Sequence, residues 1–301
     1  FFTINRYQTY LKDFYHYLDV KGITTGNYQL KTKMNDKNEE IVLDPFKRVK
    51  TFKDTNRDLN VEPLKDFGDK NRNLLISLFI KTALHVREDI ALALVLEIFG
   101  GLRRGEVVNV LRSNIRLKGV NGSKGVEVKV TDNQDKLFTH LTDTSTCEVK
   151  KKRRQSLIND ANVLYVYRKH ILWLEKLHKE LDEKGISYNK DALFLSKRTH
   201  LPLSGIGLSR AVETVRKAFL NTLLDNAYYD EYAFLTSKPW ETHIGRGLFT
   251  NICMDLGMST REIANARGDD YEFSSVDYVE EKNAVSKLEE ETNILSVSAH
   301  E

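Results

Sequence analysis

Cysteine is scarce in this chain of 301 residues, which contains only Cys147 and Cys253. Two cysteines are too few for the disulfide framework of a small secreted domain, and Cys253 lies in the apolar run 248–254. A buried free thiol in a reducing compartment is therefore expected. The chain also lacks an uninterrupted apolar run of about eighteen residues and a secretory signal, which argues against a membrane-spanning or exported protein. These absences together predict a cytoplasmic location.

Charge of one sign is not in large excess either. The formal net charge is +3, hydrophobic residues make up 41% of the chain and charged residues 30%. Such a composition is ordinary for a globular protein, and the small net charge neither supports nor excludes binding to nucleic acid, which needs only a local basic patch. The length favours two unequal domains.

The first domain is expected over residues 1–58 and the second over residues 59–301. The chain starts within a helical pattern, so it is expected to be a fragment of a longer protein; apolar residues recur at helical spacing at Ile4, Tyr7, Leu11, Phe14 and Leu18. Residues 22–60 are polar and rich in turn formers, as a connector would be, with a short hairpin predicted between 28–34 and 40–43.

The second domain is predicted to be mostly helical with a few strands. Apolar periodicity predicts helices over 75–85, 89–99, from 160 onward and around 208–219, and a capping box at Ser259 and Glu262 predicts another helix toward Arg267. Strict alternation predicts a strand over 126–130, followed by a turn at 150–154 and a returning strand over 155–159. The acidic, aromatic segment 222–240 has no functional interpretation.

Three short motifs carry residues suited to phosphate chemistry. The first is the run Gly101-Leu-Arg103-Arg-Gly-Glu106, the second is His243-Ile-Gly-Arg246, and the third is Tyr278 near the end of the chain. Two guanidinium groups can hold both non-bridging oxygens of one phosphate, and a tyrosine hydroxyl can attack phosphorus. Each motif alone has an ordinary explanation, such as a solvated cation after a helix; their order and spacing are what distinguish them.

In this order the motifs resemble the tyrosine recombinases, or phage-type integrases. The resemblance rests on Gly101, Leu102, Arg103 and Glu106, on His243 and Arg246, and on Gly268, which precedes Tyr278 at the family's spacing. It implies a mixed α+β fold that is mostly α-helical, with a small antiparallel sheet, preceded by the end of a helical core-binding domain whose larger part is missing from this chain. It also implies that Arg103, Arg246, His243 and Tyr278 are catalytic, with Tyr278 as the nucleophile.

The family also uses a lysine as the acid that protonates the leaving 5′ oxygen, and this lysine lies between the motifs that contain Arg103 and Arg246. Lys150 is the first choice here, Lys151 and Lys152 are alternatives in register, and Lys136 is more remote. The lysine run could equally be a solvated turn or a nonspecific phosphate contact.

Asp269 departs from the family pattern, which places histidine or tryptophan after the glycine. An ionised carboxylate would repel a phosphate rather than donate a hydrogen bond to it. Three explanations are open: the side chain turns away to pair with Arg267 or another cation, it is held protonated, or activity is reduced. The first is favoured, because Gly268 and Tyr278 keep the family register.

The resemblance implies cleavage and rejoining of double-stranded DNA through a 3′-phosphotyrosyl intermediate, by a homotetramer assembled on DNA, without metal or cofactor. Residues 279–301 are either a helix that docks on a neighbouring protomer or a polar tail. The composition, with little proline and much lysine and asparagine, suggests a bacterial mobile element. A DNA-binding module that no longer cleaves and an enzyme resembling type IB topoisomerases are the alternatives.

Overall fold

The computed structural model describes residues 10–11, 14–15, 17–18, 21–23, 32–34, 40–42 and 63–269. Its contacts divide the chain into two units, Phe1–Val61 and Glu62–Glu301. The predicted boundary between residues 58 and 59 lies outside the described residues and stays a prediction. In the first unit, residues 10–11, 14–15 and 17–18 are helical, and β1 (Thr32–Met34) pairs antiparallel with β2 (Glu40–Val42). The predicted hairpin is thereby confirmed.

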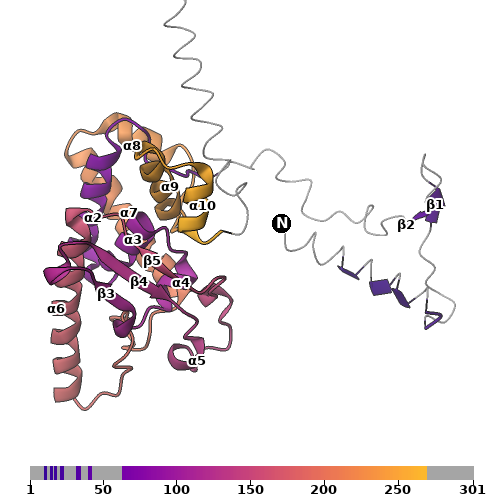
Figure 1. The fold of residues 1–301 in the computed structure, drawn as a ribbon, viewed down its shortest axis with the longest axis horizontal. Coiled ribbons are helices and arrows are strands. Elements are labelled where there is room, and N and C mark those ends of the chain that lie inside the picture. Colours follow the sequence, from indigo (N-terminus) through magenta and orange to yellow (C-terminus); the bar gives the residue numbers. More distant parts are fainter. Residues whose placement is uncertain are drawn as a thin grey trace, which may run out of the picture. The chain divides into compact units, whose positions relative to one another are not determined.

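The second unit is mainly helical (Figure 1). Its helices are α2 (Arg72–Val86), α3 (Glu88–Gly100), α4 (Arg104–Val108), α5 (Gln134–Leu137), α6 (Ala161–Glu183), α7 (Gly205–Asp225), α8 (Tyr229–Thr236), α9 (Ile244–Asp255) and α10 (Thr260–Arg267). Short 3₁₀ turns are η3 (Arg112–Asn114), η4 (Val120–Gly122) and η5 (Ser145–Cys147). In this unit, the helices predicted from periodicity and from the Ser259 capping box are all confirmed, most with ends shifted by a few residues. The helical pattern expected from Ile4 to Leu18 lies partly outside the described residues.

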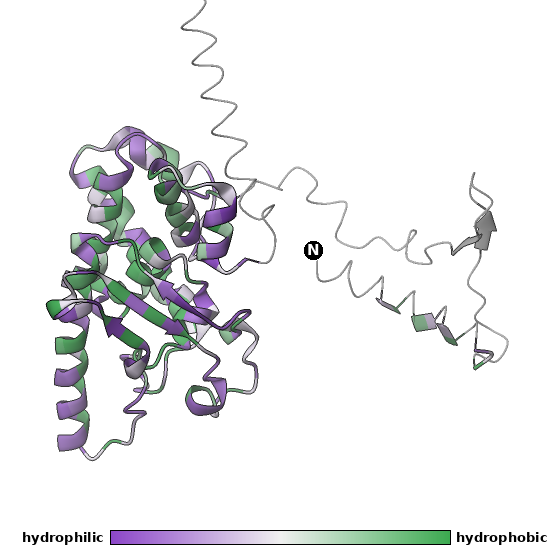
Figure 2. Ribbon diagram, viewed as in Figure 1, coloured by the Kyte–Doolittle hydropathy of each residue, from purple (hydrophilic) through white to green (hydrophobic). Residues whose placement is uncertain are grey.

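Helix α3 forms the centre of the core, as its almost entirely apolar sequence predicts. It packs against α2, α6 and α9, and every residue from Asp89 to Gly100 is buried. By contrast, α6 is amphipathic, and green and purple residues alternate around it in Figure 2. The buried position of α3 matters for function because the chain leaves it directly into the first arginine motif.

The sheet has three antiparallel strands in the order β3 (Ile115–Leu117), β4 (Val126–Val130) and β5 (Arg153–Ser156). The alternation of β4 is confirmed, since its three valines are buried. The predicted returning strand over 155–159 was wrong in its bounds, because β5 begins two residues and ends three residues earlier. Arg153 pairs with Val130 and Arg154 with Lys129, so both arginines belong to β5. Strand β3 was missed because three residues are too few to show alternation.

Segment 222–240 has a structural role in the described part of the chain. It contains the end of α7 and all of α8, and it leads to Trp240, which is buried against Phe67 and Phe79. The indole Nε1 donates a hydrogen bond of 2.9 Å to the Leu235 carbonyl. Among the described residues, no helix is both long and apolar enough to cross a membrane.

Candidate active site

Arg103 is positioned by the glycine turn that ends α3. Gly101 has a left-handed φ of 62°, and a Cβ there would lie 2.7 Å from the Phe249 ring, so glycine is required by both conformation and space. Within this turn the Leu102 amide donates to the Leu96 carbonyl. Arg103 follows as the N-cap residue of α4, in extended conformation.

Glu106 holds Arg103 in place from the first turn of α4. Its buried carboxylate accepts hydrogen bonds from the Arg103 amide at 2.9 Å and from Arg103 Nη1 at 3.3 Å. It also accepts two from Arg153, at 2.7 Å from Nη1 and 3.0 Å from Nη2. Burial opposes its ionisation, but hydrogen bonds and charge from Arg153 prevail and lower the pKa of Glu106. One carboxylate therefore links the first arginine motif to strand β5.

Arg246 projects from the first turn of α9, three residues after His243, the N-cap residue of that helix. Its side chain is buried and donates to the Gly101 carbonyl, which joins it to the turn before Arg103. Burial first, and then the positive charges of Arg267 and Arg103, lower the pKa of Arg246 to about 9. The group stays protonated at neutral pH, so the two arginines of the separate motifs are brought to one place as cations.

A third arginine of the cluster, Arg267, is buried at the end of α10. Its Nη1 donates to Thr250 Oγ1 of α9 at 2.9 Å. Gly268 then turns the chain with a φ of 67°, and a Cβ at this position would lie 2.8 Å from Arg153 Nε. The glycine of the family pattern is thus needed here to let the backbone pass close to Arg153.

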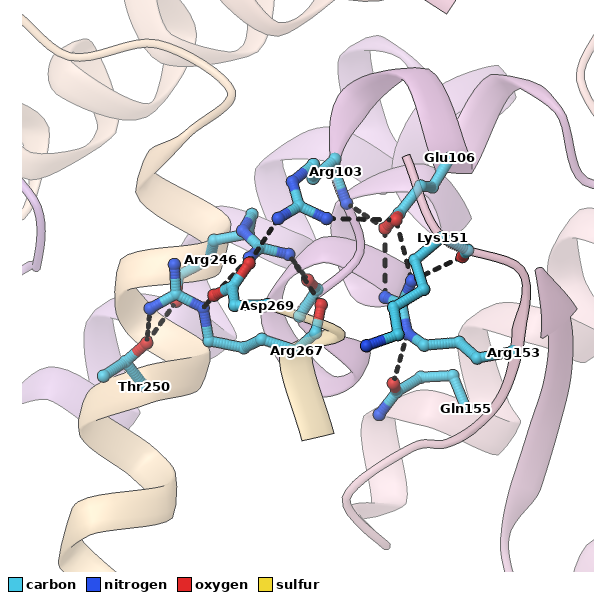
Figure 3. A network of polar contacts seen from close by, with 10 residues as sticks. Arg103, Glu106, Lys151, Arg153, Gln155, Arg246, Thr250, Arg267 and Asp269 are labelled. Carbon is cyan, nitrogen blue, oxygen red and sulfur yellow. Dashed lines mark hydrogen bonds and ion pairs between the residues drawn. The ribbon is translucent and has the colours of Figure 1, made fainter. Parts of the chain in front are cut away.

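Asp269 lies among these arginines (Figure 3). Its carboxylate accepts from Arg246 Nη2 at 2.8 and 3.0 Å, contacts Arg103 Nη2, and pairs with Arg267 Nε at 3.0 Å. The side chain is only 4% exposed. The predicted pairing with Arg267 is confirmed, but the expectation that Asp269 turns away from the site was wrong. The opposite charges of Arg103 and Arg246 attract the carboxylate into the place between them.

The cluster as a whole remains positive. Arg103, Arg153, Arg246 and Arg267 contribute four positive charges, and Glu106 and Asp269 contribute two negative ones, which leaves a net charge of two. Guanidinium groups in such an excess can bind a further anion with several charge-assisted hydrogen bonds. The arrangement is therefore suited to a phosphate group and to the extra negative charge of a pentacoordinate transition state.

His243 is exposed at the start of α9 and close to the same charges. Desolvation of its ring, followed by the positive charges of Arg104 and Arg246, lowers the pKa of His243. The imidazole is therefore neutral at pH 7 and able to accept a proton or a hydrogen bond.

The lysine run lies in the connection between β4 and β5, with Lys150, Lys151 and Lys152 all exposed. The Lys151 carbonyl accepts a hydrogen bond of 3.3 Å from Arg153 Nη1, which places this residue at the edge of the arginine cluster (Figure 3). Lys136 is exposed in the short helix α5. Tyr278 and the tail 279–301 lie outside the described residues. The role of Tyr278 as nucleophile therefore stays a prediction.

Two functional candidates were not assigned from the sequence. Arg153 was read as part of a basic turn, although its alternation with Gln155 in β5 could have indicated a side chain that faces inward. Arg267 was considered only as a partner for Asp269, although its place at the end of a capped helix fixed its position. Among the residues described, no group of three or more His, Cys, Asp or Glu side chains is arranged to hold a metal ion.

No sequence-family model matches the chain, and no curated protein matches it. Solved structures do resemble it. The Tn1549 transposon integrase in complex with a circular intermediate DNA gives a TM-score of 0.54 at 13% identity, over 92% of this chain and 74% of that one. The same integrase with transposon right end DNA gives 0.51 at 12% identity, with the same coverage.

The site-specific recombinase XerH, bound to a palindromic difH substrate in a post-cleavage complex, gives a TM-score of 0.50 at 12% identity. That match covers 88% of this chain and 62% of XerH; across the first three recombinase structures matched, the chain spans 57 to 62% of the other protein's length. Identity this low shows the fold alone. The mostly helical unit with its small antiparallel sheet has the catalytic-domain fold of the tyrosine recombinases.

Proposed function

We propose that the protein is a tyrosine recombinase that cleaves and rejoins double-stranded DNA. The observation that supports this most is the meeting of Arg103 and Arg246, from motifs far apart in sequence, on one anionic group. Two guanidinium groups that already share a carboxylate have the geometry to share a phosphate. Resemblance to solved integrase and recombinase complexes with DNA supports the choice of ligand.

In the proposed reaction, the Tyr278 hydroxyl attacks the scissile phosphorus and loses its proton. The bond from phosphorus to the 5′ oxygen breaks, which leaves a 3′-phosphotyrosyl link and a 5′ hydroxyl. Arg103 and Arg246 stabilise the added negative charge, and neutral His243 hydrogen-bonds the phosphate or accepts the tyrosine proton. Attack by a 5′ hydroxyl of another duplex reverses the step and completes strand exchange.

A lysine supplies the proton for the leaving 5′ oxygen. Lys150 was the first choice from the sequence, with Lys151 and Lys152 as alternatives. The hydrogen bond between Arg153 and the Lys151 carbonyl now supports Lys151, because it holds this residue beside the cluster. To identify the acid, each of the three lysines is replaced by alanine, and cleavage is measured on a duplex whose leaving oxygen is replaced by sulfur. A thiolate leaves without a proton, so this substrate should restore cleavage only in the variant that lacks the acid.

The proposal extends to assembly and biology. A homotetramer on two duplexes would exchange strands for a bacterial mobile element, working in the cytoplasm and without metal or cofactor. Neighbours solved with transposon DNA support the mobile-element setting. Sedimentation of the protein with and without a duplex from the ends of its element tests the assembly.

The central test is a covalent-adduct assay on a nicked suicide duplex from the ends of the element that encodes the chain. The unaltered protein is expected to form an adduct, Tyr278→Phe none, and Arg103→Lys at least about a hundredfold less, because a point charge cannot replace the planar fork. Glu180→Gln, an exposed change on α6, is the control and should cleave normally. Full cleavage by Arg103→Lys would remove this arginine from the proposed role.

One alternative is a DNA-binding module that does not cleave, and the position of Asp269 favours it specifically. A carboxylate already between the two arginines could prevent the scissile phosphate from entering. Duplex binding without any adduct from the unaltered protein would establish this alternative. Relaxation of arbitrary supercoiled plasmid by the monomer would indicate a topoisomerase instead.

A further inference from the structure

Asp269 occupies the place where the proposed function puts the scissile phosphate. Its two carboxylate oxygens accept from Arg246 and one of them also contacts Arg103, as two non-bridging phosphate oxygens would. The side chain is almost fully buried, and its backbone is fixed by a hydrogen bond of 2.9 Å from the Asp269 amide to the Ala264 carbonyl. The contact is therefore part of the folded site and not an incidental surface pair.

The same carboxylate has a second place to go. Arg267 Nε lies 3.0 Å from Asp269 Oδ2, and Arg267 is anchored independently through Thr250 on α9. If a phosphate took over Arg103 and Arg246, Asp269 could keep its ion pair with Arg267 and remain compensated inside the protein. A buried charge that loses every partner would be strongly unfavourable, so this retained pair is what makes displacement feasible.

We propose that Asp269 is an intramolecular competitor for the phosphate and that Arg267 holds it when DNA displaces it. The inference rests on the proposed function. Asp269 then determines selectivity: a weakly held phosphate does not replace a carboxylate that is already in place, whereas a duplex that also contacts the rest of the protein surface does. Arg103 and Arg246 would bind the phosphate only when the whole DNA duplex is bound to the protein.

The experiment measures equilibrium binding of an intact duplex from the ends of the element, in proteins that all carry Tyr278→Phe so that cleavage plays no part. Asp269→Asn is expected to bind on the order of tenfold more tightly, because the neutral amide no longer competes with the phosphate. Glu180→Gln removes one exposed carboxylate from α6 and should change affinity little. Equal affinities for Asp269→Asn and Glu180→Gln would overturn the proposal.

Arg267→Gln separates competition from simple repulsion. In protein with Asp269 intact it should weaken binding severalfold, because the displaced carboxylate loses its partner. In the Asp269→Asn background it should have almost no effect. An arginine that contacts DNA directly would weaken binding equally in both backgrounds, and that result would contradict the role given to Arg267.

A structure of the protein with the duplex provides a test that does not depend on whether these variants fold. The contact between Asp269 and Arg103 should be lost in the complex, while the contact with Arg267 remains. A complex that retains Asp269 between Arg103 and Arg246 would refute displacement. Binding changes as described but no adduct from the unaltered protein would leave competition supported and overturn only the proposed cleavage.

Discussion

Replacing Glu106 by glutamine tests whether one buried carboxylate organises the arginine cluster. Glu106 accepts four hydrogen bonds, from the Arg103 amide, Arg103 Nη1 and both terminal nitrogens of Arg153. Glutamine can still accept from the amide, as it does in other capping boxes, but its NH₂ group faces arginine donors and its charge is gone. The network around two arginines is therefore broken while the helix cap is kept.

The expected loss of stability is about 3 kcal/mol. Breaking a buried pair from one side costs about 3–5 kcal/mol, and the lower end applies because the arginines keep other partners. For a unit of this size the melting temperature should fall by roughly 6–12 °C. Thermal and denaturant unfolding, followed by circular dichroism, measure the change.

Glu262→Gln is the matched control. Glu262 also accepts from an N-cap amide, that of Ser259 at 2.8 Å, but it is exposed and part of a simple capping box. Its replacement should have a clearly smaller effect. Losses of equal size in the two variants would mean that only the cap matters and that the buried network does not stabilise the fold.

The pH dependence adds a second check on Glu106. Its pKa is lowered in the folded protein from the ordinary value of 4.5, so the stability it contributes is present above pH 4.5 and is lost as the pH falls through the folded pKa. The difference between the original protein and Glu106→Gln should therefore be full at pH 7 and shrink in acid. A difference that grows in acid would contradict the assigned ionisation.

Two further predictions concern buried groups near the site. Burial raises the pKa of Glu97 well above 4.5. The free energy of unfolding should therefore fall by about 1.4 kcal/mol per pH unit between pH 4.5 and the pKa of Glu97 in the folded protein. In denaturant titrations, Glu97→Gln should remove this contribution to the slope. Burial also raises the pKa of Cys253 to about 12, so mass spectrometry should find this thiol unmodified by iodoacetamide at pH 8 in the folded protein and alkylated after unfolding.

The elements that carry the site could largely be predicted from the sequence, because their signals are local. The apolar run of α3 and the glycines that end it located Arg103, and Ser259 with Glu262 located α10. Strand β5 was placed two residues late because its first two residues are arginines, which have no apolar pattern. Their position depends on pairing with β4, a contact that the local sequence does not encode.

The inward position of Asp269 could not be predicted, because it depends on the sum of several distant charges. A phosphate repels a carboxylate, and considering this pair of charges alone led to the expectation that Asp269 turns away. In the folded chain, Arg103, Arg246 and Arg267 all meet at this point, from α4, α9 and α10. The attraction of these three cations holds the carboxylate in the site, although the proposed reaction does not use it.

The three arginines also give a reason for the presence of a carboxylate in the proposed phosphate site. Without Asp269, the buried side chains of Arg246 and Arg267 would repel each other, and that repulsion already contributes to the lowered pKa of Arg246. A bound phosphate cannot neutralise them during folding, because the proposed phosphate site exists only in the folded protein. An internal anion can, and because Arg267 retains it, the anion need not leave the protein when a phosphate replaces it. In the proposed scheme, one carboxylate with three arginine partners stabilises the protein before DNA binds. When a phosphate enters, Asp269 loses its contacts with Arg103 and Arg246 and keeps the one with Arg267.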